Sequence, residues 1–461
     1  MKQFFYPSAY LGALACIFVG AAGFLLLRFL PPSAHAVWVL PLLSLMIGFL
    51  LLIKLRHLEH ALFACLAIFA CVWGLSHFVW PRSQTQLLFT APEGRAGLHA
   101  SGVRVPDSYR SPPFHQPRSL YVPAGTRIEV FRSGLKGVRW LAFSSKGDLF
   151  ASLPRAGEVV RLVDDDRDGY AEQVLVVASD LDRPHGLAFD GSDLVVAGES
   201  TLYRLPGASE RAVPPVEVIS RDMPAEGGHW TRSVVVGPER SLLVAAGSSC
   251  NACEESDARR ASVRIFPPEG GHGEPFASGL RNSVGLVRHP DNGDLWGSDN
   301  GRDMLGDDLP ADELNLIRQG LNYGWPFCYG EQQPDPQLGD AKLCADTVPP
   351  EVSIPAHSAP LGLVFGTQLR ADKQLQDSLL VAYHGSWNRS QPTGYKIVAI
   401  PFENGRPNGG PFDVVTGWLE DGSAWGRPVA LAVDPHGSLF VSDDRAGAVY
   451  RITFGDPERS R

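Results

Sequence analysis

A pattern that recurs six times in the second part of the chain constrains the fold more than any other feature. Each copy has an apolar strand, a tight polar turn with Gly, Asp or Pro, a second apolar strand, an irregular loop and a third, alternating strand. The copies begin at Arg139, His185, Arg232, Val284, Leu361 and Val429. Alternation and β-branched or aromatic content indicate strands, and a repeat of this length is typical of one propeller blade. The sequence therefore predicts an all-β, six-bladed β-propeller over residues 135–461.

Two long segments, residues 297–326 and 384–395, interrupt the repeat. Long loops on a rigid scaffold commonly carry function. We expect both to lie at one end of the propeller, where they would form a binding face. Residues 83–134 are predicted to be a linker that leads into the propeller.

The first part of the chain has a different character. Residues 9–30, 37–53 and 61–80 are three apolar runs, each about long enough to cross a ~30 Å hydrocarbon layer. Any one run alone could be a buried helix, but three in succession favour transmembrane helices, so residues 1–82 are predicted to be a membrane anchor. Lys54 and Arg56 lie in the second loop, which places that loop in the cytoplasm. The propeller is then expected outside the cytoplasmic (inner) membrane, in the periplasm of a Gram-negative cell.

The net charge of the remaining residues bears on their partners, and their cysteine content bears on their compartment. Residues 1–82 hold five Lys/Arg and one Glu, so 36 basic and 49 acidic residues, a net charge of −13, remain for the rest. Such a charge argues against a nucleic-acid partner. Cys250, Cys253, Cys328 and Cys344 lie beyond the apolar runs, and an oxidising compartment favours the disulfides 250–253 and 328–344. A zinc site made of these four Cys would need a CxxC pair at both ends, and Cys328 and Cys344 lack that spacing.

Polar residues stand just before the first strand of five copies: His185, His229, Arg281 with Asn282, His357 and Arg427. Because these positions are equivalent, we expect the side chains to converge on one pocket at the axis. A neutral imidazole beside guanidinium groups can act as a general base, and Arg binds carboxylates. The loop at Gly301 can present carbonyls to a hard cation such as Ca²⁺. Together these groups suit a carboxylated cofactor held on calcium.

An acidic stretch in the first copy, "DDDRDGYAE", places Asp164, Asp166 and Asp168 at alternate positions before Gly169, with Glu172 following. This resembles the start of an EF-hand calcium loop. No Glu stands at the twelfth position, so we interpret the stretch as a hairpin loop whose calcium binding is open.

The motifs "GLRNSVGL", "SDNGRD" and "DELNLIRQGLNYGWP" resemble the signature of the soluble quinoprotein glucose dehydrogenases and the related sorbosone (aldose sugar) dehydrogenases. The segments "GGHWTRSVVVGP" and "HGSWNRSQPTGYKI" add to the resemblance, which covers about residues 135–455. "HGSWNR" favours the sorbosone branch. The resemblance implies a six-bladed propeller that uses pyrroloquinoline quinone (PQQ) and Ca²⁺ to oxidise sugars.

Residue by residue, the resemblance implies that His229 is the catalytic base and that Arg281 stabilises charge on the reduced cofactor. Asn282 would contact the cofactor. The carbonyls of Gly301 and Arg302 would ligate the cofactor's Ca²⁺.

Glu313 and Tyr323 match ligands of a separate calcium region, Tyr323 through its backbone. His185, His384, Arg389 and Arg427 are further candidates for cofactor binding. The family's cofactor-binding Lys has no matched position, and His384, Asn388, Arg389 and Lys396 lie near it.

The sequence departs from the glucose enzymes at two site positions. Ser248 stands where they have the Asp that orients the catalytic His, and Arg302 stands where they have Pro.

The sequence thus predicts a membrane-anchored enzyme that oxidises an aldose or sugar aldehyde, with a small sugar as substrate. The electron acceptor would be a quinone or a carrier that no motif identifies. Two alternatives are a calcium-dependent, lactonase-like hydrolase and a non-catalytic sugar-binding propeller.

Overall fold

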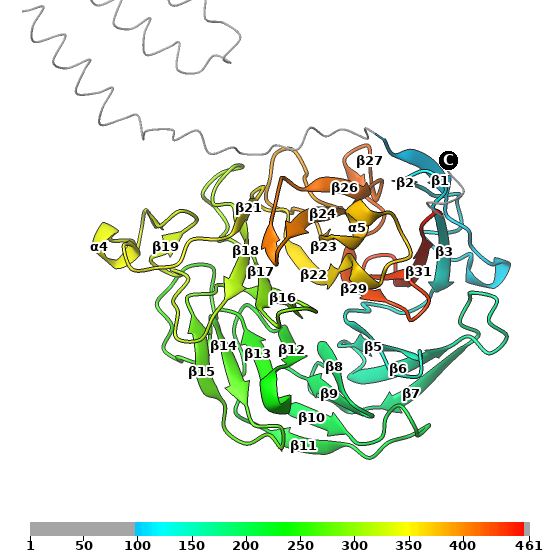
Figure 1. Cartoon of the computed structure of the whole chain (residues 1–461), viewed down its shortest axis with the longest axis horizontal. Coiled ribbons are helices and arrows are strands. Elements are labelled where there is room, and N and C mark those ends of the chain that lie inside the picture. Colours follow the sequence, from blue (N-terminus) through cyan, green and yellow to red (C-terminus); the bar gives the residue numbers. More distant parts are fainter. Residues whose placement is uncertain (1–96, 456–461) are drawn as a thin grey trace, which may run out of the picture. The chain divides into compact units, whose positions relative to one another are not determined.

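Residues 97–455 are described by the computed structural model, and their strands form six sheets arranged around a common centre (Figure 1). The first strands of neighbouring sheets contact one another in a closed circle, in the order β4, β8, β12, β16, β22, β29 and back to β4. The predicted all-β, six-bladed propeller is therefore confirmed.

Four antiparallel strands make up each blade, from the centre outward. Blade 1 contains β4 (Leu141–Phe143), β5 (Leu149–Leu153), β6 (Glu158–Val163) and β7 (Gln173–Ala178). Blade 2 contains β8 (Gly186–Asp190), β9 (Asp193–Ala197), β10 (Leu202–Leu205) and β11 (Glu217–Ser220). Blade 3 contains β12 (Arg232–Val236), β13 (Leu242–Ala246), β14 (Ser262–Phe266) and β15 (Glu274–Ser278).

The last three blades carry the irregular segments. Blade 4 contains β16 (Ser283–Arg288), β17 (Leu295–Asp299), β18 (Asp312–Ile317) and β21 (Val352–Ile354). Blade 5 contains β22 (Pro360–Phe365), β23 (Ser378–Tyr383), β24 (Lys396–Glu403) and β26 (Phe412–Val415), with β25 (Arg406–Pro407) paired to the end of β24. Blade 6 contains β29 (Pro428–Val433), β30 (Leu439–Asp443), β31 (Ala448–Thr453) and β3 (Arg127–Arg132).

Short elements decorate the ring. Three two-stranded pairs are β1 (His99–Gly102) with β2 (Ser119–Val122), β19 (Cys328–Tyr329) with β20 (Gln333–Pro334), and β27 (Leu419–Glu420) with β28 (Ser423–Ala424). Within the described part of the chain, the helices are α4 (Ala341–Cys344) and α5 (Lys373–Gln376), and the 3₁₀ turns are Asp107–Tyr109, Pro238–Arg240 and Gly366–Gln368. No helix within residues 97–455 has the length and apolar character needed to span a bilayer, and the three predicted spans lie outside the described residues.

The apolar runs of the repeat become the second strands of the blades. In five blades, β5, β13, β17, β23 and β30 are buried along their whole length. Both faces of such a strand are covered by the neighbouring blades, so the strand is largely apolar and does not alternate with exposed polar residues; its few polar residues, such as Ser298 and Asp299 at the end of β17, are also buried. Outer strands such as β11, with the burial pattern exposed–exposed–partly buried–buried, meet solvent.

The ring is closed by a strand from the stretch predicted as the linker. The sixth copy of the repeat supplies only three strands, and β3 pairs with the last of them, β31. In this pairing Ile128 lies opposite Ile452 and Val130 opposite Tyr450, and all four side chains are fully buried. Closure therefore joins the two ends of the propeller sequence within one sheet.

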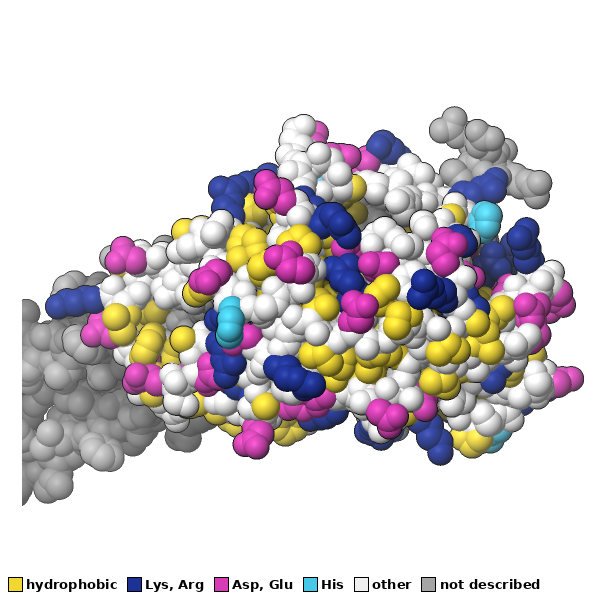
Figure 2. All heavy atoms as spheres, turned by 90° about the horizontal axis from the view of Figure 1, so that it is seen from below, with side chains coloured by type: hydrophobic (Ala, Val, Ile, Leu, Met, Phe, Trp, Pro, Cys, Tyr) yellow, Lys and Arg dark blue, Asp and Glu magenta, His cyan; other side chains and the backbone are white. Residues whose placement is uncertain are grey.

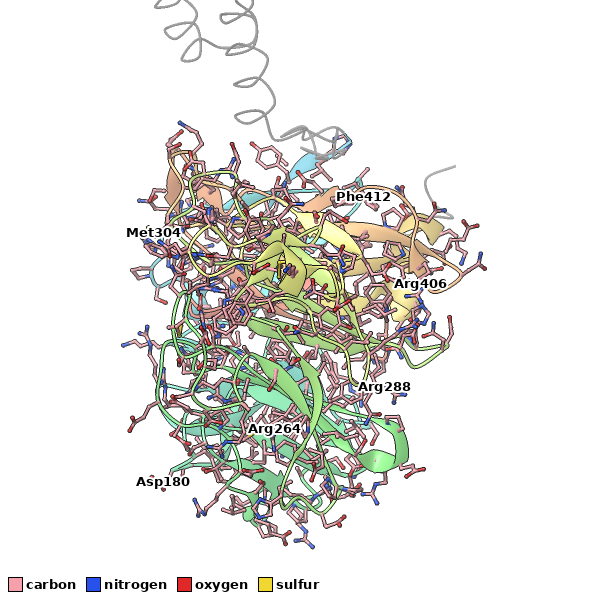
Figure 3. All side chains as sticks on the ribbon, turned by 90° about the vertical axis from the view of Figure 1, so that its left-hand side faces the viewer. Asp180, Arg264, Arg288, Met304, Arg406 and Phe412 are labelled. Atoms are coloured by element: carbon pink, nitrogen blue, oxygen red, sulfur yellow. A yellow bond between two sulfur atoms is a disulfide. The ribbon has the colours of Figure 1, made fainter. Side chains whose placement is uncertain are left out.

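The two faces of the ring differ. Met304, in the predicted insertion 297–326, lies on one face, whereas Arg288 and Arg406 lie on the opposite face (Figure 3). On the side shown in Figure 2, acidic and basic side chains are interspersed with apolar ones. Both predicted disulfides, Cys250–Cys253 and Cys328–Cys344, are confirmed.

Replacing the buried Ile128 on β3 by Ala tests the closure. We expect Ile128→Ala to lower the free energy of unfolding by about 2–5 kcal/mol, because it leaves a cavity in the closing sheet. Arg127→Ala, exposed on the same strand, is the matched control and should change it by less than about 0.5 kcal/mol. Urea denaturation followed by tryptophan fluorescence measures both, and equal effects would contradict the closing role of β3.

Candidate active site

A pocket of about 140 Å³ opens where the ends of blades 3, 4 and 5 meet the two insertions. Polar side chains from all three blades line most of it. They are His229, Arg281, Asn282, Asn300, Asp303, Asp312, His357 and Asn388, joined by Gly301, Ala359 and Trp387. The predicted convergence is therefore seen for His229, Arg281, Asn282 and His357.

The imidazole of His229 is oriented by Ser248, the position where the glucose enzymes carry Asp. Its Nδ1 lies 2.9 Å from the Ser248 carbonyl oxygen and 2.8 Å from Ser248 Oγ. Because a carbonyl only accepts, Nδ1 carries the hydrogen. The Ser248 hydroxyl donates onward to the Cys250 carbonyl at 2.7 Å. The network leaves Nε2 as the basic nitrogen of a residue that lines the pocket.

Burial and neighbouring charge keep this imidazole neutral. Desolvation, followed by the positive charge of Arg281, lowers the pKa of His229 to about 4. Its backbone is fixed by Arg232, whose Nη1 donates to the His229 carbonyl at 3.0 Å. His229 is therefore an unprotonated base at neutral pH.

Gly247 allows the two sides of the pocket to approach. A Cβ at Gly247 would lie 2.6 Å from Asn282 Oδ1 and 2.7 Å from His229 Cβ. Any larger residue would push these two side chains apart.

The guanidinium of Arg281 is 4% exposed and is held by neutral oxygens. Its Nη1 donates to the carbonyls of Asn300 at 3.0 Å and Gly301 at 2.8 Å. The carboxylate of Asp303 is farther away, at 3.7 Å from Nη2. The positive charge of Arg281 is thus fixed in place and only weakly neutralised by Asp303.

Buried carboxylates shape the loop beneath the pocket. Asp299 accepts the backbone N–H groups of Arg281 at 2.9 Å and Asn282 at 2.7 Å. Asp312 accepts those of Gly301 at 2.8 Å and Ala359 at 2.9 Å. Burial raises the pKa of Asp299 to about 6 and that of Asp312 to about 7. A bound cation would favour the charged carboxylates and so lower these two pKa values again.

A family model described as TrAA12-like matches residues 120–454. The chain belongs to this family. A PQQ-dependent sugar dehydrogenase of Hypocrea jecorina (strain QM6a) is 26% identical over 395 residues, which cover 71% of this chain and 87% of that protein. A PQQ-dependent pyranose dehydrogenase of Coprinopsis cinerea is 27% identical over 294 residues, 49% of this chain, and the match spans only 39% of that enzyme.

Solved structures share the TrAA12-like fold. The calcium structure of a Trichoderma reesei family AA12 enzyme has a TM-score of 0.64 at 24% identity, covering 72% of this chain and 96% of that one. The family assignment agrees with the predicted resemblance to PQQ-dependent sugar dehydrogenases. The sorbosone branch stays a prediction.

In this TrAA12-like chain, the four predicted metal-ligating residues line one pocket beside Arg281, and Gly301 also lines the pocket of His229. This second, small pocket of about 20 Å³ is lined by Arg281, Gly301, Arg302, Glu313 and Tyr323, among others. The Arg302 side chain turns to Asp335 at 2.6 Å, so only its carbonyl is left for a metal.

The carboxyl of Glu313 is buried, and no Lys or Arg among residues 97–455 forms an ion pair with it. It accepts from the Gly330 N–H at 2.9 Å and from Asn315 Nδ2 at 3.1 Å, and desolvation raises its pKa to about 8. The Tyr323 hydroxyl donates to the Leu316 carbonyl at 2.6 Å, which leaves only the Tyr323 backbone for the predicted ligation. The metal roles of all four residues stay predictions.

The other predicted cofactor-binding residues of the chain do not line the pocket of His229. His185 is fully buried between Trp140 and Trp230, with Nδ1 3.0 Å from the Arg232 carbonyl. His384 pairs with Asp444 at 2.9 Å.

Arg427 and Arg389 hold backbone segments together. Arg427 donates through Nε to the His384 carbonyl at 3.0 Å. Arg389 joins the insertions, with Nη2 2.8 Å from Asp308 Oδ1. Lys396, which lies in sequence near the expected position of the family's cofactor-binding Lys, pairs with Asp413 at 2.8 Å.

Several residues of the site were not singled out from the sequence. Asp303 and Asp312 lie in the acid-rich segment 297–326, and no sequence pattern distinguishes them from its other Asp and Glu residues. Asn300 precedes Gly301, and Asn251 stands between two cysteines. The only available signal for Asn251 was its place inside the CxxC motif.

The carboxylates of Asp164, Asp166, Asp168 and Glu172 place one oxygen each within 4.8 Å of the others. The structure thus brings together the four acids of the EF-hand-like stretch. Whether they bind calcium stays open.

The pKa of His229 tests the role of Ser248. We expect Ser248→Asp to raise it from about 4 by about one unit or more, because a carboxylate favours the imidazolium. Ser248→Ala, which keeps the carbonyl acceptor, should leave it nearly unchanged. Ring NMR signals followed against pH give both values, and a pKa that Ser248→Asp does not raise would contradict this orientation of the ring.

Proposed function

We propose that the chain is a PQQ- and calcium-dependent sugar dehydrogenase that oxidises an aldose or a related sugar aldehyde. One observation carries the proposal: a neutral imidazole with a free Nε2 shares a pocket with the buried, weakly neutralised guanidinium of Arg281. The names of the relatives from Hypocrea jecorina and Coprinopsis cinerea support it.

The residues present fit both groups. Arg281 with the amide of Asn282 suits a ligand with carboxylate and quinone oxygens. The Gly301 carbonyl and the carboxylates of Asp303 and Asp312 line the same pocket. An all-oxygen set of this kind suits a hard cation such as Ca²⁺.

When bound, the quinone supplies a two-electron acceptor for hydride. His229 accepts the proton of the sugar hydroxyl at Nε2, so that the carbon loses a hydride and the oxygen a proton. The guanidinium of Arg281 stabilises negative charge that develops opposite His229. Trp387, at 69% exposure, presents a flat apolar face at the rim of the pocket, against which a sugar ring can rest.

The location is part of the proposal. Residues 1–82 would anchor the enzyme in the cytoplasmic membrane, with the propeller on the outer side. The two disulfides support an oxidising compartment for the propeller. Electrons would pass from the reduced cofactor to a membrane quinone or a carrier protein.

A calcium-dependent lactonase-like hydrolase is a second candidate. The observation that favours it is that Asn282, Asn300, Asp303 and Asp312 line one pocket, because side-chain oxygens of these types can hold a catalytic Ca²⁺. A hydrolase would need no quinone.

Reconstitution with the cofactor distinguishes the dehydrogenase from the hydrolase. The purified full chain, supplied with PQQ and Ca²⁺, is expected to reduce an acceptor dye with at least one of a panel of aldoses. His229→Gln should lower kcat by about 10²-fold or more, because the base is lost, while PQQ binding persists. His272→Gln, at an exposed histidine, is the control. Lactone cleavage without quinone, and no dye reduction, would instead favour the hydrolase.

A further inference from the structure

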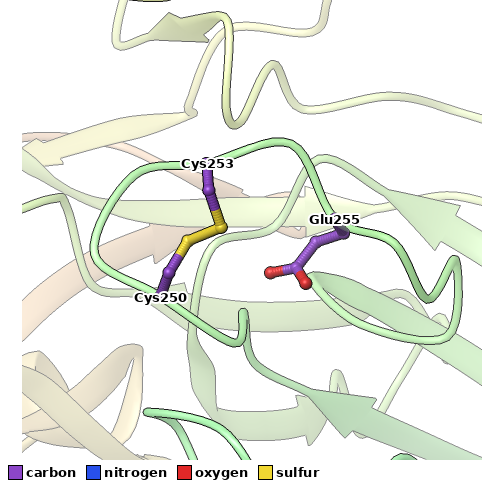
Figure 4. Close-up of side chains that lie close together, drawn as sticks. All are labelled: Cys250, Cys253 and Glu255. Carbon is purple, nitrogen blue, oxygen red and sulfur yellow. A yellow bond between two sulfur atoms is a disulfide. The ribbon is translucent and has the colours of Figure 1, made fainter.

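The loop after β13 carries a disulfide beside the pocket. Cys250 and Cys253 are joined there, and Glu255 lies next to them (Figure 4). Glu255 Oε1 accepts the Ser249 N–H at 2.6 Å, which ties the far side of the loop to its start. The segment between the cysteines is thus closed by a covalent link and a charged hydrogen bond.

Asn251 lies inside this closed segment and grips Arg281. Its main-chain carbonyl accepts from Arg281 Nε at 3.0 Å, and its side-chain Oδ1 accepts from Arg281 Nη2 at 3.0 Å. One residue therefore holds the whole Nε–Nη2 edge of the guanidinium. The opposite nitrogen, Nη1, is left for the carbonyls of Asn300 and Gly301.

The Asn251 amide also pairs with the backbone of the first insertion. Oδ1 accepts the Asp303 N–H at 2.8 Å, and Nδ2 donates to the Asp303 carbonyl at 3.2 Å. Asp303 Oδ1 in turn accepts from Asn388 Nδ2 at 2.7 Å, in the second insertion. Asn251 thus connects the disulfide loop of blade 3 to the loops that line the pocket from blades 4 and 5.

The chemistry of Asn251 suits a fixed positive charge. A carboxylate at this place would neutralise the guanidinium, whereas an amide and a carbonyl fix its direction and leave its charge available. The same loop begins at Ser248, which orients His229. One short segment therefore sets the direction of both the neutral base and the guanidinium of the proposed reaction.

We propose that Asn251, held by the Cys250–Cys253 disulfide, is the positioning residue that aims Arg281 into the pocket. The inference rests on the proposed function, since it assigns Arg281 its direction in that reaction. Asn251 acts through Arg281, and its own side chain need not touch sugar or cofactor.

A double-mutant cycle with PQQ, Ca²⁺ and a turned-over aldose tests this. Asn251→Leu is expected to lower kcat about tenfold or more while the sugar KM changes less than about threefold, because a misdirected Arg281 loses interactions made in the transition state. In an Arg281→Gln background, Asn251→Leu should have little further effect. Additive losses, or an Asn251→Leu enzyme within twofold of the native kcat, would overturn the proposal.

Three further measurements complete the test. Glu254→Gln, exposed on the same loop, is the matched control and should retain native kcat. If Asn251→Leu does not fold, as judged by its thermal transition, the kcat of the double variant Cys250→Ser/Cys253→Ser is measured in its place. A kcat loss of threefold or more in that variant supports the proposal, provided Cys328→Ser/Cys344→Ser does not match it, and an unchanged kcat overturns it.

Failure of the proposed function is recognised separately. In the cofactor-free protein, Asn251→Leu should speed hydrogen exchange in the peptide containing the Asp303 amide, which loses its acceptor. If the native protein neither binds PQQ nor oxidises sugars, the dehydrogenase assignment falls. Faster exchange would then still support the clamp of Asn251 on this loop, and unchanged exchange would overturn it.

Discussion

Closure of the ring is the constraint on which the rest of the structure depends. The pairing of β3 with β31 joins the two ends of the propeller sequence, and the first strands then contact one another in a complete circle. A closed ring has no free edge between blades, so the ends of blades 3, 4 and 5 are fixed relative to one another. The pocket inherits this rigidity, because His229, Arg281 and His357 all stand two or three residues before first strands.

Within that frame, the guanidinium of Arg281 and the imidazole of His229 are both held mainly by neutral hydrogen-bonding partners. Arg281 is surrounded by carbonyl and amide oxygens, His229 is oriented by a carbonyl and a hydroxyl, and the nearest buried carboxylates bind backbone N–H groups. The substitution of Ser for Asp at position 248 fits this arrangement, because it orients the imidazole without raising its pKa. Such a pocket is prepared for a ligand that brings negative charge and for a cation that compensates the acids below it.

The sequence alone predicted the blades, both disulfides and the meeting of His229 with Arg281 and Asn282, because repeat position determines which loop end a residue occupies. The sequence did not show which of the other predicted histidines and arginines line the pocket and which do not. His229 and His357 stand three residues before β12 and β22 and line the pocket, whereas His185 and Arg427 stand immediately before β8 and β29 and do not. β3 could not be assigned because its partner lies more than three hundred residues away, and Asn251 because its role depends on a contact between two irregular loops.

The most direct measurement of the central claim is a crystal structure of the full chain with PQQ and Ca²⁺. The account predicts the quinone in the pocket between His229 and Arg281, with calcium at the Gly301 carbonyl and Asn251 still bound to the guanidinium. A quinone found elsewhere on the ring, or an Arg281 turned away from the bound cofactor, would contradict it.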